Sequence, residues 1–307
     1  MNDLRRIYEY LMEEQMNLFR TISRRSALKS GITAATLTAS SAPSALAAEP
    51  DPSYIAKFKK KPGETKIICV MGDYWHLASA QERHVRQIFS SNRDWKVYFV
   101  LASRYLTKEL LSDTDLLITA RYSGNDDPAW TPEPIVGQRP PGDPIWTEEH
   151  VSTVIDNVKT RGMGFLSVHC NLFCLNNDLE DLMGIEPLLH QEMQPLIVQD
   201  LNQEHPITKG ISPFTVTLDD QFDVELKYPE RTTKLFNTLS VHDKRLAVNG
   251  WCLDQGKGRV VGLIPGQFQF VYRVPQYQEI FWRAAYWAMN RKIEPYPNAS
   301  TDTKGFV

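Results

Sequence analysis

"GMGFLSVHC" runs from Gly162 to Cys170, and the fold can be worked out from this stretch. Gly162 and Gly164 introduce a short apolar run of strand length, and His169 and Cys170 follow at its end. α/β proteins often carry a reactive side chain at such a strand-to-helix corner. We therefore predict a buried strand here, whose end forms part of a functional site.

Three similar apolar runs lie upstream, and helical patterns separate them. The strand-like runs are "TKIICVMG" (65–72), "WKVYFVLA" (95–102) and "DLLITA" (115–120). The helical patterns cover residues 80–89, 107–111 and 147–162, and Thr147 is the expected N-cap of the last one. This alternation predicts a mostly parallel sheet with helices on both faces and ligands at the carboxyl ends of the strands.

The second half of the chain is richer in strand-like runs. These are "PLIVQD" (195–200), "FTVTLDDQF" (214–222), "RLAVNGWC" (245–252) and "GRVVGLIPG" (258–266). Residues 278–291 have an amphipathic pattern that predicts a closing helix with its aromatic side chains in the core. We predict one α/β domain over residues 65–291, preceded by a linker over 49–64 and followed by a flexible tail over 292–307.

The first 48 residues have the features of an export signal. Arg24 and Arg25 form a pair typical of twin-arginine signals, and a weakly apolar run without acidic residues follows. Ala45 and Ala47 give the small-x-small form of a cleavage site. Residues 1–15 are unusual for such a signal, so Met16 is an alternative start. The pattern predicts an exported, periplasmic protein.

Composition excludes some classes of partner. The net charge is −3, whereas nucleic-acid binding needs clustered Lys and Arg. No apolar stretch reaches the length of a membrane span. The run Lys59–Lys61 is expected to be a solvated part of the linker.

The chain has four cysteines: Cys69, Cys170, Cys174 and Cys252. They are expected to be buried thiols, and a disulfide between Cys170 and Cys174 is an alternative.

Four motifs together resemble the trehalose-utilisation (ThuA-like) family. They are "GMGFLSVHC", "HPITKGISPF" (205–214), "DDQF" (219–222) and "GKGRVVGLIPGQ" (256–267), and they come in the family's order. Two positions depart from the family pattern. Gln267 stands where a histidine is usual, and Phe222 replaces a tyrosine.

The resemblance implies a fold of the class I glutamine-amidotransferase type, a flavodoxin-like three-layer sandwich. It also implies sugar metabolism, including keto glycosides made by a partner sugar dehydrogenase. His169 takes the position of the amidotransferase nucleophile, and Cys170 falls one residue later. Only one side chain points outward from such a corner, and no Gly-x-Cys-x-Gly surrounds Cys170. His169 is therefore the better candidate for chemistry.

The predicted catalytic residues are His169, His76, Asp73 and Asp220. His76 and Asp73 follow the first strand, and we expect that strand to lie beside the strand of His169, which would bring both histidines to one crevice. Asp219 and Asp220 are neighbours on a strand, so only one of them can enter the crevice, and Asp220 is the family's acidic position. A histidine and a carboxylate suit general acid–base chemistry.

Further residues are expected to contact the substrate. They are Tyr74, Trp75, Tyr122, Asn171, His205 and Gln267, although His205 precedes a proline and would equally organise its turn. Residues 122–146 are rich in Pro and Gly and are predicted to form a lid. His84 in a helix, and His190 and His242 in loops, receive no role. Gly256–Gly258 is predicted to be a hairpin turn rather than a phosphate site.

A metal remains open at this stage. His76, His169 and a carboxylate would suit a divalent ion such as zinc, and without a metal the same groups can act as a base and the residue that orients it. The function predicted is a carbohydrate-active enzyme, such as a glycoside or keto-sugar hydrolase. The alternatives are a carbohydrate-binding protein without turnover, consistent with Phe222 and Gln267, and a cysteine-dependent hydrolase that uses Cys170.

Overall fold

The computed structural model describes residues 52–72, 76–100, 105–121, 147–169 and 177–297. All of them belong to one compact unit. In these five ranges no helix is both long enough and apolar enough to traverse a bilayer. The predicted signal over 1–48 and the predicted lid over 122–146 lie outside the described residues.

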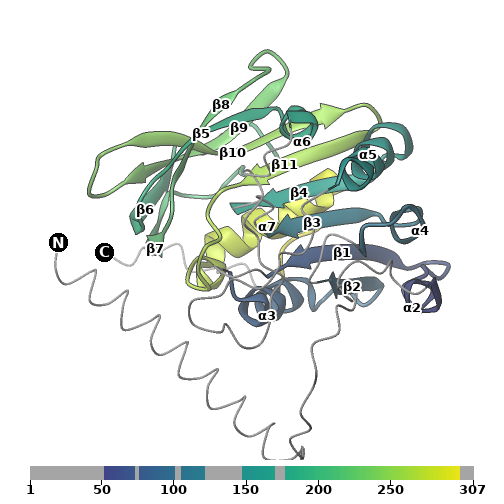
Figure 1. Cartoon of the computed structure of the whole chain (residues 1–307). Coiled ribbons are helices and arrows are strands. Elements are labelled where there is room, and N and C mark those ends of the chain that lie inside the picture. The colour runs from purple at the N-terminus through teal and green to yellow at the C-terminus, as the bar shows by residue number, and fades with distance from the viewer. Residues whose placement is uncertain (1–51, 73–75, 101–104, 122–146, 170–176, 298–307) are drawn as a thin grey trace, which may run out of the picture. The chain divides into compact units, whose positions relative to one another are not determined.

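A nine-stranded sheet organises this unit, with the order β2-β1-β3-β4-β11-β10-β9-β6-β7 (Figure 1). Its first five strands are parallel. They are β1 (Thr65–Met71), β2 (Trp95–Val100), β3 (Leu116–Ala120), β4 (Gly164–Val168) and β11 (Gly258–Leu263). Their order is that of a flavodoxin-like sheet, so the predicted α/β class is confirmed.

The prediction that the first and fourth strands lie side by side is wrong. β3 lies between β1 and β4 and pairs with both. The reason is the flavodoxin-like order itself, in which the chain moves outward one strand at a time after β2 and β1 are placed. The carboxyl ends of β1 and β4 nevertheless open on the same edge of the sheet, because all these strands are parallel.

The other half of the sheet is antiparallel. Its further strands are β6 (Gln194–Gln199), β7 (Phe214–Asp219), β9 (Thr232–Ser240) and β10 (Leu246–Gln255). A separate two-stranded sheet joins β5 (Ile185–His190) and β8 (Phe222–Leu226). The sequence patterns missed β5 and β9, and they merged β7 with the start of β8.

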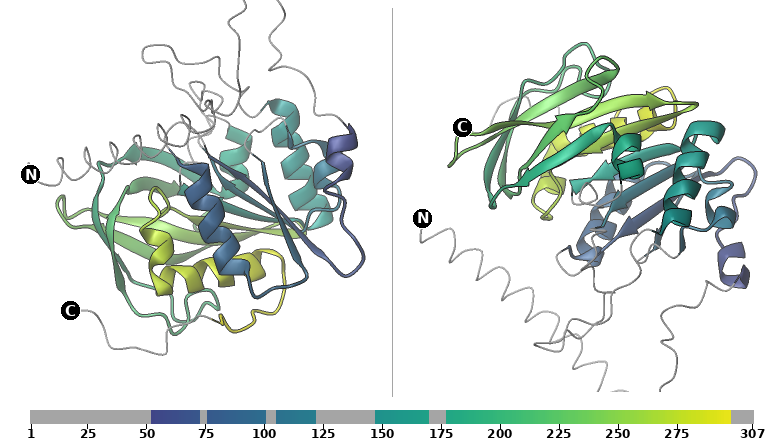
Figure 2. Two further views of the ribbon diagram at one scale, coloured as in Figure 1. Left: turned by 90° about the horizontal axis from the view of Figure 1, so that it is seen from below. Right: turned by 45° about the horizontal axis from the view of Figure 1, so that its top comes forward.

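Helices cover both faces of the parallel half (Figure 2). Alternate residues of β1 point to opposite faces, and all of them are buried. One face packs against α3 (Ala78–Phe89) and α7 (Pro275–Ala288). The other packs against α2 (Pro52–Ala56), α4 (Lys108–Leu111), α5 (Glu148–Asp156) and α6 (Asn177–Met183).

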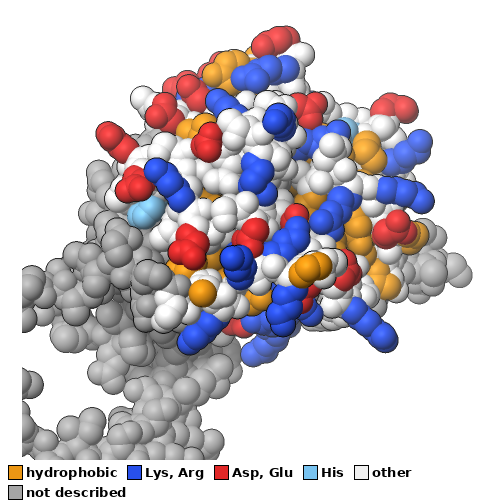
Figure 3. Space-filling model, turned by 90° about the vertical axis from the view of Figure 1, so that its right-hand side faces the viewer, with side chains coloured by type: hydrophobic (Ala, Val, Ile, Leu, Met, Phe, Trp, Pro, Cys, Tyr) orange, Lys and Arg blue, Asp and Glu red, His pale blue; other side chains and the backbone are white. Residues whose placement is uncertain are grey.

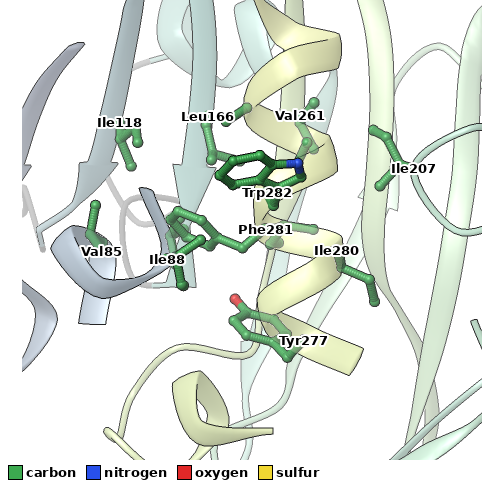
Figure 4. Packing of buried hydrophobic residues seen from close by; sticks show 14 of the residues in the cluster. Val85, Ile88, Ile118, Leu166, Ile207, Val261, Tyr277, Ile280, Phe281 and Trp282 are labelled. Carbon is green, nitrogen blue, oxygen red and sulfur yellow. The ribbon is translucent and has the colours of Figure 1, made fainter. Parts of the chain in front are cut away.

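The closing helix α7 lies in the middle of one core, as its amphipathic pattern predicts. Phe281 and Trp282 face the sheet side chains Leu166 and Val261, with Ile88 of α3 beside them (Figure 4). All five side chains are at most 2% exposed. Burial of this size is the main favourable term that holds the helix on the sheet.

The entry into β4 shows how local sequence sets the position of the corner. Thr147 accepts a hydrogen bond from the backbone of His150 at the start of α5, which confirms the predicted N-cap. The helix ends in a π-helical turn over Asn157–Arg161, and Gly162 closes it with φ = 92°, a conformation that favours glycine. A Cβ at Gly164 would lie 2.7 Å from a backbone oxygen of α7, so only glycine fits there.

Two smaller predictions are confirmed. The Gly256–Lys257 pair connects β10 to β11 as a hairpin turn, because Gln255 pairs with Gly258. Cys69 and Cys252 are buried free thiols, whereas Cys170 and Cys174 lie outside the described residues.

The predicted linker and tail are shorter than expected. Ile55 of α2 is buried in the second core, and Lys60 forms a 2.7 Å ion pair with Asp115, while Lys59 and Lys61 are exposed as expected. At the other end, Tyr296 is buried and its hydroxyl donates to Gln278. Apolar and paired side chains therefore extend the packed unit to residues 52 and 297. Figure 3 shows one face of this unit, where cationic and anionic side chains are interspersed.

Candidate functional site

His169 occupies the sharp corner after β4. Its backbone has φ = 52°, in the left-handed region that a residue with a Cβ rarely adopts. This conformation costs about 1–2 kcal/mol, so the surrounding structure must impose it. The side chain is 1% exposed. The corner therefore holds one imidazole in a fixed, buried position.

The hydrogen bond of His169 determines which ring nitrogen carries the proton. Nδ1 lies 3.0 Å from the carbonyl oxygen of Ile264. A carbonyl can only accept, so Nδ1 carries the proton and donates, and Nε2 of the neutral ring keeps its lone pair. The contact follows from the parallel register, in which Leu263 of β11 pairs with Val168 of β4.

The environment keeps this imidazole neutral. Burial, and to a smaller extent the neighbouring His76, lower the pKa of His169 to about 4 against the opposing effects of Asp220 and the carbonyl of Ile264. At neutral pH the ring is a proton acceptor at Nε2.

Asp220 supplies a carboxylate beside this acceptor. Its side chain is 5% exposed, and Oδ2 lies 4.0 Å from Nε2 of His169. The same oxygen accepts a 2.8 Å hydrogen bond from Nε2 of His190, whose side chain is 55% exposed. Oδ1 of Asp220 has no hydrogen-bond partner among the described residues.

Asp219 has a different role from its neighbour. Its carboxylate accepts backbone N–H groups of Gly266 and Gln267, each at 3.0 Å, and that of Asp220 at 2.8 Å. Burial and the charge of Asp220 raise the pKa of Asp219, and the three N–H donors oppose this rise. These contacts join the end of β7 to the loop after β11, which leaves Asp220 as the carboxylate near His169.

Two rings and an amide surround His169. The His76 ring lies edge-on at 5.1 Å between ring centres, and the Phe222 ring lies at 4.9 Å. The Gln267 side chain is close enough to raise the pKa of His169 slightly, but its buried Oε1 has no hydrogen bond of normal geometry among the described residues. The glycine at 266 permits this approach, because a Cβ there would lie 3.1 Å from that of His169.

The loop that carries His76 is anchored at the ends of β1 and β3. Gly72 has φ = 85°, and a Cβ there would lie 2.3 Å from that of Ala78. Its N–H donates to Gln81, whose amide donates to the carbonyl of Ala120, and its own carbonyl accepts from Arg121. These bonds tie the neighbouring strand ends together, and His76 lies at this edge with its ring against that of His169.

The structure brings together His76, His169, Asp220 and Gln267 of the predicted site. It places His205 elsewhere, against Trp287 of α7 and 3.5 Å from the thiol of Cys252. His205 Nδ1 accepts the backbone N–H of Ile207, which is the turn-organising role. The remaining predicted residues lie outside the described ones: Asp73, Tyr74, Trp75, Tyr122 and Asn171.

Sequence reasoning missed His190. We expected this histidine in a loop, but it is the last residue of β5 and pairs with Phe222 of β8. Its ring stacks on Phe222 and hydrogen-bonds to Asp220. The run that forms β5 contains Pro187, which obscured the strand signal.

Within the described ranges, no three His, Cys, Asp or Glu residues are grouped so as to hold a metal ion.

Comparisons with known proteins agree with this fold. The family model for ThuA, trehalose utilisation, matches residues 66–288. The fold is similar to a ThuA-like protein from Parabacteroides merdae ATCC 43184, with 15% identity and a TM-score of 0.58 over 78% of this chain and 94% of that one. A ThuA-like protein from Bacteroides uniformis ATCC 8492 is similar too, with 12% identity and a TM-score of 0.52 over 76% and 96%.

A cytoplasmic protein from Salmonella typhimurium LT2 shares 13% identity and a TM-score of 0.50 over 74% of this chain and 98% of that one. No curated protein matches the chain. At these identities the three solved structures establish the fold alone.

Proposed function

The chain belongs to the trehalose-utilisation (ThuA) family, and from this premise we propose that it acts on a carbohydrate by acid–base chemistry centred on His169. The observation that carries the proposal is the fixed tautomer. The carbonyl of Ile264 holds the Nδ1 proton, so Nε2 is a buried acceptor beside the carboxylate of Asp220. The family's name supports a sugar as the ligand.

The proposed chemistry begins with a hydroxyl group or a water molecule that donates to Nε2 of His169. The imidazole accepts that proton as general base. Asp220 stabilises the imidazolium that forms, since its negative charge favours the protonated ring. The hydrogen bond from His190 holds Asp220 in place, so His190 is a positioning residue.

Three finer parts of the proposal rest on the sequence. Export is supported by the Arg24–Arg25 pair and the cleavage pattern that ends at Ala47. A keto glycoside from a sugar dehydrogenase is the proposed natural form of the ligand, and the resemblance to the family supports it. A divalent metal would be a further partner of His76 and His169.

A binding protein without turnover is the second candidate. Phe222 packs its ring on His169, and Gln267 brings an amide that has no titratable proton near neutral pH. Both side chains suit recognition without assisting proton transfer. Ligand binding without product formation would favour this reading.

The test compares His169→Asn with wild type in turnover and binding of mono- and disaccharides, their keto forms included. Asparagine tolerates a positive φ, so the corner is preserved. His242→Asn, at an exposed turn, is the matched control. We expect turnover to fall at least about a hundredfold in His169→Asn, as for loss of a general base, and to be unchanged in the control.

Equal activity of wild type and His169→Asn would overturn the proposed chemistry. A Cys170→Ala variant separates the cysteine-dependent alternative, since we expect it to retain full activity. Loss of activity in Cys170→Ala alone would transfer the chemistry to the thiol.

A further inference from the structure

Three buried acceptors belong to His169 and to two side chains beside it, Asp220 and Gln267. Nε2 of His169 keeps its lone pair because Nδ1 donates to Ile264. Oδ1 of Asp220 and Oε1 of Gln267 are buried, and neither has a hydrogen-bond partner among the described residues. Asp220 is 4% exposed, so bulk water does not satisfy its free oxygen. Buried polar atoms in folded proteins are normally paired, which points to a ligand as the missing partner.

The geometry explains why these acceptors do not satisfy one another. Oδ2 of Asp220 lies 4.0 Å from Nε2 of His169, beyond hydrogen-bond distance. The described donor to this carboxylate, Nε2 of His190, is engaged at Oδ2. A partner that enters here must therefore bring hydrogen-bond donors of its own.

The functional groups of sugars differ in whether they can donate a hydrogen bond. A hydroxyl group donates one hydrogen bond, whereas a ketone oxygen can only accept. A ketone placed against a carboxylate oxygen and an unprotonated imidazole nitrogen would leave all of these atoms unpaired. Two hydroxyls on neighbouring carbons can donate to Nε2 of His169 and Oδ1 of Asp220 at once.

We propose that the site recognises a vicinal diol of its sugar ligand and discriminates against a ketone at either of those two carbons. The inference rests on the proposed function and deepens it. A keto group, where the ligand carries one, is then placed at a carbon that does not face His169 and Asp220. This reverses the simplest expectation for an enzyme of keto sugars, in which the carbonyl itself faces the base.

The test uses trehalose and its deoxy and keto derivatives at each ring carbon, with affinity measured by calorimetry. We expect trehalose to bind at least about tenfold more tightly than the deoxy and keto derivatives at two neighbouring carbons, because buried acceptors would lose their donors. Derivatives at the remaining carbons should bind like trehalose.

Asp220→Asn sharpens the test. The amide oxygen of the asparagine can still accept the hydrogen bond from His190. The amide NH₂ group then takes the place of Oδ1 and is a donor instead of an acceptor. We expect the variant to bind trehalose at least about tenfold more weakly. It should also lose the preference for trehalose over the keto derivatives at those two neighbouring carbons. A merely structural role of Asp220 would weaken both ligands equally. Asp254→Asn, on an exposed side chain of β10, is the control and should retain the wild-type preference.

The outcomes separate the two proposals. Equal or tighter binding of the keto derivatives at every carbon overturns the diol inference and leaves the carbohydrate function standing. No binding by trehalose or by other gluco-, galacto- and manno-configured glycosides overturns both. Binding that a chelator abolishes and zinc restores would assign the acceptors to a cation and also overturn the diol inference.

Discussion

At the scale of single residues, His169 combines three constraints that together suit a proton acceptor. The corner fixes its backbone at φ = 52°, the carbonyl of Ile264 fixes its tautomer, and burial fixes its charge state. None of these would be needed for a histidine that only fills space. His190 on the same carboxylate is half exposed, and its Nε2 donates to Asp220 instead of keeping a lone pair for a substrate.

The pH profile of turnover should identify the base. His169 acts as acceptor only when neutral, and its pKa is lowered to about 4. We expect kcat/KM to stay level from neutral pH down to about pH 5 and to fall below that with an apparent pKa near 4. The measurement is kcat/KM against pH with unfolding followed in parallel. An acid limb near 6.5, the ordinary histidine value, would contradict the assignment and point to an exposed histidine instead.

At the scale of elements, the β10–β11 hairpin shows a turn set by both backbone conformation and contact. Gly256 has φ = 63° at the first central position, as a type II′ turn requires. Its missing Cβ would also lie 2.4 Å from the carbonyl oxygen of Lys159, at the end of the helix that leads into β4. The hairpin and the entry to the corner are therefore packed together.

Gly256→Ala should destabilise the protein more than Gly210→Ala. Both glycines have positive φ, but a Cβ at Gly210 would meet nothing within 4 Å. We expect Gly210→Ala to cost about 1 kcal/mol from strain alone, and Gly256→Ala to cost roughly 2–4 kcal/mol because of the added clash. Chemical denaturation of both variants measures the difference. Equal losses of unfolding free energy in the two variants would show that the backbone at Lys159 moves away from the added Cβ without destabilising the protein.

At the scale of the whole molecule, buried histidines should make the fold sensitive to acid. Burial lowers the pKa values of His84, His169 and His205 in the folded protein, whereas the unfolded chain titrates near 6.5. Between these values the unfolded state binds more protons. The free energy of unfolding should therefore fall as the pH is lowered from about 6.5 toward 4. Denaturation curves across this range give the slope.

His84→Phe should reduce that slope and stabilise the protein. Neither ring nitrogen of His84 has a hydrogen bond among the described residues, and the ring stacks on Tyr272. Phenylalanine keeps the stacking and removes the unpaired buried nitrogens. We expect the free energy of unfolding at pH 7 to rise by about 1–2 kcal/mol. A destabilised variant would show that His84 serves a polar partner outside the described residues.

Local patterns in the sequence were sufficient for the first four strands of the parallel half and the helices between them, but not for the order of those strands. Apolar strands that alternate with capped helices need no distant information, because hydrophobic periodicity and caps are local signals. The corner at His169 followed from the same reasoning, since a short apolar run that ends in polar residues marks the edge of a sheet. The four family motifs added Asp220 and Gln267 to the candidates.

Only the tertiary structure decided which side chains meet. Strand order placed β3 between β1 and β4, and His76 nevertheless contacts His169. The pairing of β5 with β8 places His190 beside Asp220. The register between β4 and β11 places His169 beside the carbonyl of Ile264. Contacts of this kind join residues 30 to 95 positions apart. Local patterns cannot specify them, because pairing partners are chosen by the packing of the whole sheet.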